Sequence, residues 1–160
     1  MKVLITGING NHARMVALRL LAQGHEIFGI DRRPWPDAPP NIHVFQTDVR
    51  KRPAADVFRN HRPDVVVHMA AQPLVRESYR NPRYTYETNA MGTLSVLEAV
   101  AATASVRAHI VITTDKVYRN VNQQKGYAEC APLGGDDPYS ASKAMADLLA
   151  QSWIRSFPGA

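Results

Sequence analysis

Short apolar runs alternate with longer segments of helical pattern along most of the chain. The predicted strands lie near residues 2–6, 26–30, 43–46, 64–68 and 108–113, and the predicted helices lie near residues 11–23, 53–61, 83–104 and 138–156. Alternation at this spacing predicts an α/β fold, in which helices cover both faces of a parallel sheet. Right-handed crossovers then give a doubly wound sheet with the strand order 3-2-1-4-5.

Two of the predicted strands, at residues 65–67 and 110–112, are continuous apolar runs. Strands that are covered on both faces have this composition, so both are expected to be buried. With 160 residues, the chain has the length of one domain that can bury a core. The long connections at 32–41 and 118–138 are predicted to be loops of the functional or mobile kind.

Composition and charge exclude several classes of protein. No run of eighteen apolar residues is present, so no membrane span is expected. A chain that opens directly on a strand is not expected to carry a signal peptide. The single cysteine, Cys130, cannot form an internal disulfide, which fits the cytoplasm. The six histidines show no ligand spacing, so no metal site is expected.

The formal net charge is +5, and much of the excess lies between Arg32 and Arg62. This basic region is interpreted either as a solvated face or as an attraction for an anionic nucleotide. No aromatic interleaving or recognition motif accompanies it, so nucleic-acid binding is not expected.

A glycine-rich segment directly follows the first apolar run. Gly7 allows the tight turn that leaves the strand, and Gly10 lets the backbone approach a pyrophosphate closely. The helix that begins at Asn11 and His12 directs free N–H groups and a positive dipole end at that phosphate. Ala13 stands at the third small position of the dinucleotide fingerprint. Taken alone, the segment is equally compatible with a plain strand–helix loop.

Asp31 strengthens the dinucleotide interpretation, because it follows the second apolar run at about the expected distance. A carboxylate there accepts hydrogen bonds from the adenosine ribose hydroxyls and repels a 2′-phosphate, which favours NAD. Arg32 and Arg33 argue the other way, since a guanidinium could pair with that phosphate. NAD is the cofactor we expect.

All of these groups, and others like them, follow a predicted strand at its carboxyl end. Ligands bind at those ends in doubly wound sheets, so this convergence is stronger evidence than any single motif. In strand order, the groups are Gly7 to His12, Asp31, Asp48, Ala70 to Gln72, and Thr113 to Lys116.

Tyr139 and Lys143 are four residues apart in the last predicted helix, so they share one helix face. A free tyrosine is a weak base at neutral pH, but a nearby ammonium and a cationic nicotinamide ring favour its phenolate. Tyr139 could then remove a hydroxyl proton during hydride transfer. Spacing alone would equally allow a packed tyrosine and a solvated lysine. The dinucleotide turn and the strand-end Thr-Asp-Lys favour the catalytic interpretation.

Four further stretches resemble a known family. They lie at residues 68–76, 88–93, 114–118 and 134–140. With the two motifs above, they make the chain similar to the extended short-chain dehydrogenase/reductases of the NAD-dependent epimerase/dehydratase type, which have a Rossmann-type fold. The second half resembles the CDP-glucose 4,6-dehydratase branch, because Asp115-Lys116 stands where dTDP-glucose dehydratases have Asp-Glu. The first half, to about Met69, resembles the family more generally.

The resemblance implies a three-stage reaction on the hexose of a nucleotide sugar. Tyr139, helped by Thr114, would remove the 4-hydroxyl proton while C4 gives hydride to NAD. Lys116 would take the C5 proton and Asp115 would protonate the leaving 6-hydroxyl. Water would leave and hydride would return to C6, so the resemblance implies a lyase that forms a 4-keto-6-deoxy sugar nucleotide.

The resemblance also implies residues around the cofactor. Lys143 would hold the nicotinamide ribose and favour the Tyr139 phenolate, and Asp48 and Val49 would lie by the adenine. The cleft itself would be lined by Ala70, Ala71, Gln72 and Thr88.

Family members are longer than this chain, and their C-terminal part binds the nucleotide sugar. Residues 1–160 are therefore expected to be an N-terminal part, a single Rossmann-type domain that is truncated before the last strands and the substrate domain and is inactive alone. The strand near 108–113 is then expected to be an exposed apolar edge. The helices near 83–104 and 138–156 correspond to those that pair as a four-helix bundle in the family, which implies a homodimer. Departures from the family pattern are Ala13 at the third glycine and a missing arginine in the stretch 125–129.

Three interpretations of function stay open. The first is a nucleotide-sugar 4,6-dehydratase of the CDP-glucose type. The second is another reaction on the same scaffold, such as 4-epimerisation or simple oxidation. The third is a cofactor-binding module with no turnover of its own. Asp115 and Lys116 favour dehydration, because an epimerase needs no acid–base pair to eliminate water.

Overall fold

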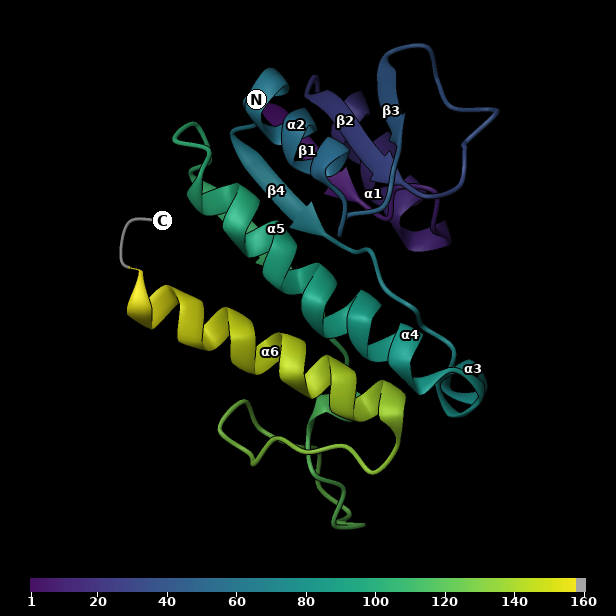
Figure 1. Ribbon diagram of the computed structural model, residues 1–160, viewed down its shortest axis with the longest axis vertical. Helices are drawn as coiled ribbons and strands as arrows, with labels where there is room; N and C mark the ends of the chain where they lie inside the picture. The colour runs from purple at the N-terminus through teal and green to yellow at the C-terminus, as the bar shows by residue number, and fades with distance from the viewer. Residues whose placement is uncertain (158–160) are drawn as a thin grey trace. The chain divides into compact units, whose positions relative to one another are not determined.

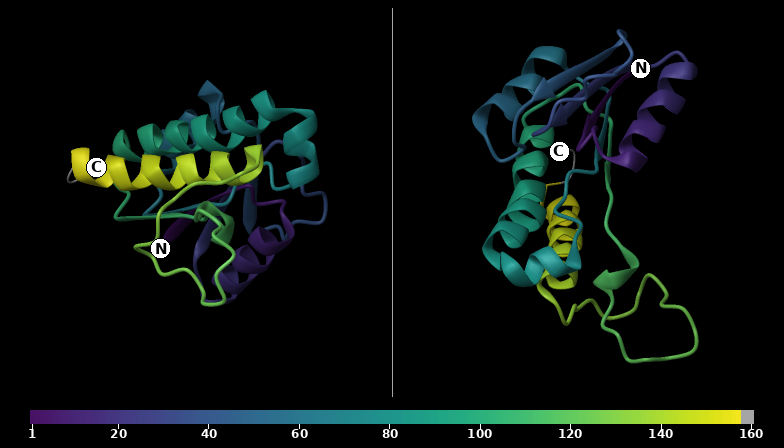
Figure 2. Two further views of the ribbon diagram at one scale, coloured as in Figure 1. Left: turned by 90° about the horizontal axis from the view of Figure 1, so that it is seen from below. Right: turned by 90° about the vertical axis from the view of Figure 1, so that its right-hand side faces the viewer.

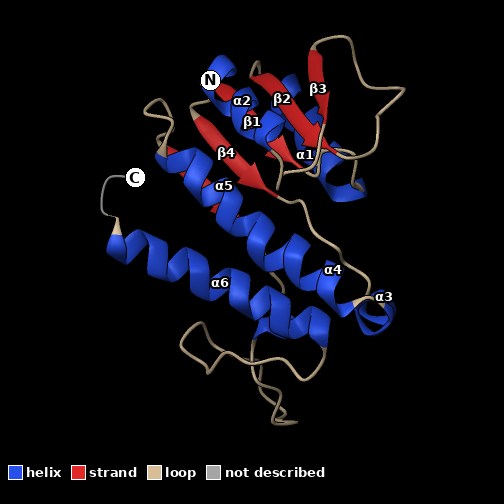
Figure 3. Ribbon diagram, in the orientation of Figure 1, coloured by secondary structure: helices blue, strands red, loops and turns tan. Residues whose placement is uncertain are grey.

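The computed structural model describes residues 1–157, which form two compact units. The first, which we call the sheet unit, comprises Met1–Ala70 and Ser95–Ile112. The second, which we call the helical unit, comprises Ala71–Leu94 and the described part of Thr113–Pro158. Figure 3 shows that the strands belong to the sheet unit, while helices and a long loop make up the helical unit.

The sheet has five strands, and every neighbouring pair runs parallel. Figure 1 labels β1 to β4 of this sheet. Their order is β3-β2-β1-β4-β5, so the predicted order 3-2-1-4-5 and the doubly wound α/β fold are confirmed. The register places Thr6 opposite both Ile30 and His68, so neighbouring strands end at nearly the same level. The strands are β1 (Lys2–Thr6), β2 (Glu26–Asp31), β3 (Ile42–Gln46), β4 (Val65–His68) and β5 (Ala108–Val111).

Helices cover both faces of the sheet, as the right-hand view of Figure 2 shows for α1 and α2. On one face, α1 (Asn11–Ala22) buries Ala13 and Ala17 in a cluster with strand residues such as Ile5 and Ile27. On the other, α2 (Arg52–His61) and the second half of α5 (Gly92–Ala101) pack on strand residues such as Leu4 and Phe28. Alternate residues of β1, β2, β3 and β4 therefore enter opposite cores, because side chains alternate across a strand.

The two apolar runs differ in exposure: the run in β4 is covered as its composition predicts, whereas the run that includes β5 is partly exposed, as expected for a strand left at an apolar edge. In β4, Val66 and Val67 are buried, whereas Ile110 of β5 is 49% exposed and the following Ile112 is 42% exposed. The reason is position, because β4 lies between two strands while β5 has only β4 beside it among the described residues. An edge strand receives less cover than a central one.

The helical unit is built around α6 (Pro138–Ser156), which packs against the other helices of this unit. Figures 1 and 2 both show α6 running beside α4. The elements that contact α6 here are α3 (Val75–Arg80), α4 (Pro82–Tyr86), the π-helix η1 (Glu87–Met91) and the 3₁₀-helix η2 (Asp115–Val117).

The helix predicted at 83–104 is observed as the consecutive segments α4, η1 and α5, over residues 82–101. The short helix α3 was not predicted. The predicted loop at 118–138 is observed, and its ends are joined by a bridge between Tyr118 and Leu133. Over residues 1–157, no helix has both the length and the apolar character needed to cross a membrane.

Candidate functional site

The turn between β1 and α1 is closed by Gly7. Its φ of +72° lies in the left-handed region, and its N–H donates to the Ile30 carbonyl at 2.7 Å. A Cβ at this position would lie 2.7 Å from both the N and Cα atoms of Ala70. Position 7 therefore requires glycine for two reasons: its backbone angle disfavours other residues, and the Ala70 backbone leaves no space for a Cβ.

Helix α1 presents its N-terminus at the same turn. Gly10 is its N-cap, no side chain caps the helix there, and the first turn contains no acidic residue. Asn11 and His12 are both exposed. The first N–H groups of a helix have no partner within the helix, and with the helix dipole they form a site for an anion.

Asp31, the last residue of β2, joins two backbone segments. One carboxylate oxygen accepts from the Asn9 N–H at 3.0 Å, and the other accepts from the Arg33 N–H at 2.9 Å. The half-buried carboxylate therefore holds both the glycine-rich turn and the loop after β2, while Arg32 is exposed. A carboxylate can accept about four hydrogen bonds, so both oxygens keep capacity for a ligand.

Asp48 follows β3 and is paired with Arg50. The Arg50 guanidinium contacts the carboxylate at 2.7 Å, and the Arg50 N–H donates to it at 2.9 Å. These hydrogen bonds hold the pKa of Asp48 below its usual range, although burial opposes them. Val49 packs against the core cluster that lies under α2.

In the helical unit, Asn89 connects three segments of the chain. Its amide oxygen accepts from the Gln72 N–H at 2.7 Å, and its amide nitrogen donates to the Gln72 carbonyl and to Ser142 Oγ. Ser142 Oγ in turn donates to the Tyr139 carbonyl at 2.7 Å. This buried network fixes the segment after Ala71 against the first turns of α6.

Thr88 is buried in η1, and its hydroxyl oxygen has no hydrogen-bond partner among the described residues. A buried polar atom without a partner is uncommon and calls for an explanation such as a ligand or water. Thr88 is one of the residues predicted to line the cofactor cleft.

Tyr139 and Lys143 lie one turn apart near the start of α6. Asp137 caps this helix, since its carboxylate accepts from the Ser140 N–H at 3.0 Å and from the Ser140 hydroxyl. Tyr139 is half-buried, whereas Lys143 is only 5% exposed. Burial lowers the pKa of Lys143 to about 8, and the negative charge of Asp147 opposes the shift.

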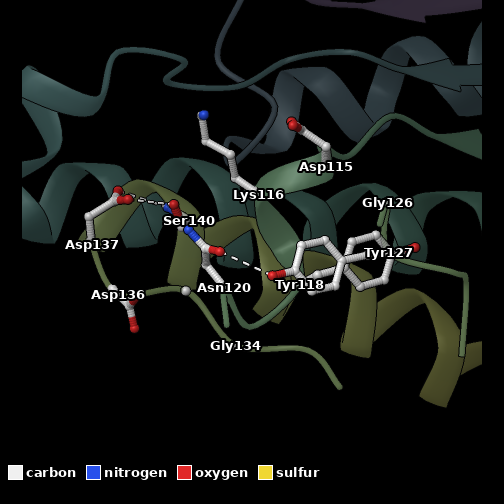
Figure 4. A pocket seen from close by; sticks show the side chains of 11 residues that line it. Asp115, Lys116, Tyr118, Asn120, Gly126, Tyr127, Gly134, Asp136, Asp137 and Ser140 are labelled. Atoms are coloured by element: carbon white, nitrogen blue, oxygen red, sulfur yellow. Dashed lines mark hydrogen bonds between the residues drawn. The ribbon is translucent and has the colours of Figure 1, made fainter. Parts of the chain in front are cut away.

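The Thr-Asp-Lys stretch forms the start of η2. Thr114 caps this short helix, and its hydroxyl donates to Asp115 Oδ1 at 2.9 Å. Asp115 and Lys116 are exposed and extend in the same direction (Figure 4). They line a cavity of about 450 Å³. Its other walls are residues of the loop between Tyr118 and Asp137, and Ser140 in the first turn of α6.

The loop wall of this cavity is held by two stacked tyrosines, Tyr118 and Tyr127, whose ring centroids lie 5.8 Å apart. Tyr127 also donates its hydroxyl to the Asn120 amide oxygen at 3.0 Å, as Figure 4 shows.

The predicted residues thus form one group in each unit. The sheet unit holds Gly7, Gly10, Asn11, His12, Asp31, Arg32, Asp48, Val49 and Ala70, and the helical unit holds Ala71, Gln72, Thr88, Thr114, Asp115, Lys116, Tyr139 and Lys143.

Sequence reasoning missed Asn89, Ser142 and the tyrosine pair. It could have found the Asp137 cap, because an aspartate before a proline is a helix-start signal. No group of candidate metal ligands occurs within residues 1–157.

The chain is similar to known proteins in sequence and in fold. The family model described as "NAD dependent epimerase/dehydratase family" matches residues 3–160. The chain is 38% identical to a CDP-glucose 4,6-dehydratase of Salmonella typhimurium, over 98% of this chain and 46% of that protein.

The chain is also similar to solved structures, among them two that contain NAD. One is a UDP-glucose 4-epimerase of Thermus thermophilus in complex with NAD, with a TM-score of 0.89 and 29% identity over 98% of this chain and 52% of that one. The other is a dTDP-glucose 4,6-dehydratase of Streptomyces venezuelae with NAD bound, with a TM-score of 0.87 and 28% identity over the same shares.

The chain spans about half the length of the curated relatives that it matches. The family match extends over nearly the whole chain, and the strand order is that of a Rossmann-type fold. The expectation of NAD as cofactor is therefore confirmed for the family. We conclude that the chain belongs to the NAD-dependent epimerase/dehydratase family.

Proposed function

We propose that the sheet unit binds the adenosine and pyrophosphate part of NAD. Three observations on the sheet unit fit the binding of this part of NAD. Gly7 forms a turn with no room for a side chain, α1 offers N–H groups without a competing acidic residue, and Asp31 keeps acceptor capacity for ribose hydroxyls. Asp48 and Val49 are proposed to lie by the adenine.

We propose that the helical unit contributes the residues that hold the nicotinamide part. The Thr88 hydroxyl is buried and has no hydrogen-bond partner within residues 1–157, and Lys143 is buried on the same helix face as Tyr139. Ala71 and Gln72 complete this part, and Asn89 fixes the backbone of Gln72.

We propose that the reaction is the 4,6-dehydration of a nucleotide hexose, with CDP-glucose as substrate. The observation that carries this proposal is the pair Asp115 and Lys116, whose side chains line one cavity and point the same way. Elimination of water needs an acid and a base on neighbouring carbons, and this pair supplies both. The 38% identity to a CDP-glucose 4,6-dehydratase supports the choice of nucleotide.

Three side chains of this protein are assigned the proton transfers, and a fourth orients the substrate. The Tyr139 phenolate accepts the 4-hydroxyl proton, and the Thr114 hydroxyl helps to orient that hydroxyl. Lys116, as the free amine, accepts the C5 proton and returns it to C5 when hydride adds at C6. Asp115, as the acid, protonates the 6-hydroxyl so that it leaves as water. NAD, when bound, supplies the acceptor for the hydride that leaves the sugar and the donor for the hydride that returns.

Lys143 supports Tyr139 through its charge. Burial brings the pKa of Lys143 to about 8, so the side chain is still mostly an ammonium at neutral pH. We assign this ammonium, one helical turn from Tyr139, to stabilise the negative charge on the phenol oxygen during the proton transfer. Because Lys143 is buried, water screens this interaction less than it would at the surface.

A 4-epimerase is the second candidate, and the similarity to the Thermus thermophilus epimerase favours it. Both reactions need the 4-hydroxyl proton to be removed, so Tyr139 and Lys143 do not separate them. Asp115 and Lys116 do, because epimerisation at C4 eliminates no water.

The test is a chimera in which this chain is continued by the part of the Salmonella relative that it does not match. The chimera is incubated with NAD and, separately, with CDP-, dTDP- and UDP-glucose, and the products are identified by mass spectrometry. We expect loss of one water, to a 4-keto-6-deoxy product, fastest with CDP-glucose. Tyr139→Phe should abolish the product, and Asp115→Asn should leave oxidation at C4 and block loss of water.

Interconversion of UDP-glucose and UDP-galactose with no loss of water would overturn the dehydratase proposal in favour of the epimerase.

A cytoplasmic location is also proposed, because the one cysteine, Cys130, is exposed and free, which fits a reducing compartment.

A further inference from the structure

Two buried polar side chains meet at the carboxyl ends of the two central strands of the sheet unit. Thr6 ends β1 and His68 ends β4, and the two residues are paired in the register. Thr6 is fully buried and His68 is 2% exposed. Thr6 Oγ1 lies 2.6 Å from His68 Nδ1, which is a short hydrogen bond.

The remaining contacts of the Thr6 hydroxyl determine its direction. Thr6 Oγ1 also accepts from the N–H groups of Met69 and Ala70, each at 3.2 Å, and the Met69 N–H is shared with the Thr6 carbonyl at 3.1 Å. A hydroxyl has one proton and two lone pairs, so these two donors occupy the lone pairs. The hydroxyl proton must therefore be donated to His68 Nδ1. His68 is then a neutral imidazole with its proton on Nε2.

This hydrogen bonding holds the exit of β4 against the turn after β1. Ala70, which Thr6 Oγ1 binds, is the residue whose backbone leaves no room for a Cβ at Gly7. On its other side, Gly7 donates to the Ile30 carbonyl at the end of β2. The glycine turn is thus fixed from both neighbouring strands, and Thr6 and His68 provide the β4 side.

We propose that Thr6 and His68 are positioning residues for the phosphate-binding turn. They set the distance between the Ala70 backbone and Gly7, and through it the direction of the N–H groups that receive the pyrophosphate of a dinucleotide. Neither side chain touches the ligand. This inference rests on the proposed function, that the sheet unit binds NAD.

The test compares variants of the 160-residue chain by calorimetric titration with NAD. Thr6→Val keeps the shape of the side chain and removes the hydroxyl, whereas Thr6→Ser keeps the hydroxyl. We expect Thr6→Val to weaken NAD binding at least about tenfold, since it removes the hydroxyl that pairs with the Ala70 N–H and with His68 Nδ1, and Thr6→Ser to stay within about threefold of the wild type.

Thr103→Val is the matched control for loss of a buried hydroxyl. Thr103 is 8% exposed, lies in the same unit, and donates to the Ala99 carbonyl at 2.7 Å, away from the turn. It should lower the free energy of unfolding and leave the NAD affinity unchanged. An equal loss of affinity in Thr103→Val and Thr6→Val would overturn the inference, because it would show a general effect of stability.

A spectroscopic measurement tests the hydrogen bonding itself. The ¹⁵N chemical shifts of the His68 ring should be those of an unprotonated Nδ1 and a protonated Nε2 in the wild type. A protonated Nδ1 would overturn the proposed direction of the Thr6 hydroxyl and the inference with it.

A second pair of variants covers the case in which Thr6→Val does not fold. His68→Asn offers an amide oxygen that can accept from Thr6, and His68→Leu offers none, so only His68→Asn should keep NAD affinity. Equal affinities in the two would overturn the inference. If the wild type binds no NAD, both the proposed function and this inference are overturned. If the wild type and Thr6→Val bind NAD with equal affinity, only this inference is overturned.

Discussion

At the scale of single residues, Gly7 and Gly24 show two different reasons why a position requires glycine: the backbone angle and the space for a side chain. Both have positive φ, +72° and +82°. A Cβ at Gly7 would meet the Ala70 backbone at 2.7 Å, while a Cβ at Gly24 would have no atom within 4 Å. The two positions therefore differ in steric contact and agree in backbone angle.

Substitution by alanine at these two positions should have unequal effects. Gly24→Ala should lower the free energy of unfolding by roughly 1–2 kcal/mol, the cost of the left-handed region for a residue with a Cβ. Gly7→Ala should cost about 1–3 kcal/mol more, because backbone atoms must also move. Urea denaturation of both variants measures the difference. Equal losses would show that Ala70 does not confine the turn.

Lys143 should make stability depend on pH. Its pKa is about 8 when folded and near 10.5 when unfolded, so between these values the unfolded chain binds more protons. Stability from this residue therefore rises with pH through that window and is lowest below pH 8. Between pH 7.0 and 9.5 the gain should be about 2 kcal/mol relative to Lys143→Met, which cannot titrate. Urea denaturation of both proteins at the two pH values tests this, and parallel pH curves would contradict the burial of a charged lysine.

At the scale of elements, the start of α6 depends on one cap. The Asp137 carboxylate accepts from the Ser140 N–H and hydroxyl, whereas the neighbouring Asp136 is exposed. Asp137→Ala should cost about 1 kcal/mol of stability, and Asp136→Ala, which removes the same charge, should cost less than about 0.5 kcal/mol. Thermal or urea unfolding of the two variants gives the comparison. A larger loss in Asp136→Ala would show that the charge, not the cap, stabilises the helix.

The elements that the sequence predicts are those with a periodic pattern. All five strands and their order follow from apolar runs and right-handed crossovers. The helix α3 has only six residues, which is too short for a helical period to be visible. The network of Asn89 joins residues 17 and 53 positions away, and no local pattern encodes such hydrogen bonds. The exposure of Ile110 likewise depends on which strand lies at the edge, and not on its own run.

At the scale of the whole molecule, the exposed apolar residues of α6 favour a homodimer. Met145 is 44% exposed and Leu148 is 52% exposed, although Leu97 and Val100 on α5 are buried. The paired helices that the family resemblance implies would cover the α6 residues. We expect a dimer in light scattering at a concentration on the order of tens of micromolar.

The variant Leu148→Lys should shift this dimer to a monomer, since a charge would enter the apolar contact. Met15→Lys is the control, because Met15 is 69% exposed on α1 of the sheet unit. A monomeric wild type, or a dimer that Leu148→Lys leaves intact, would contradict pairing through α6.

Binding of NAD by the 160-residue chain is the property on which every functional proposal above depends. Calorimetric titration with NAD and with NADP, for the wild type and for Asp31→Asn, measures it directly. We expect NAD to bind at least about tenfold more tightly than NADP, and Asp31→Asn to lose that preference, because the carboxylate accepts from ribose hydroxyls and repels a 2′-phosphate. Binding of NADP that equals or exceeds that of NAD, or no binding of either, would contradict the role given to Asp31 and the glycine turn.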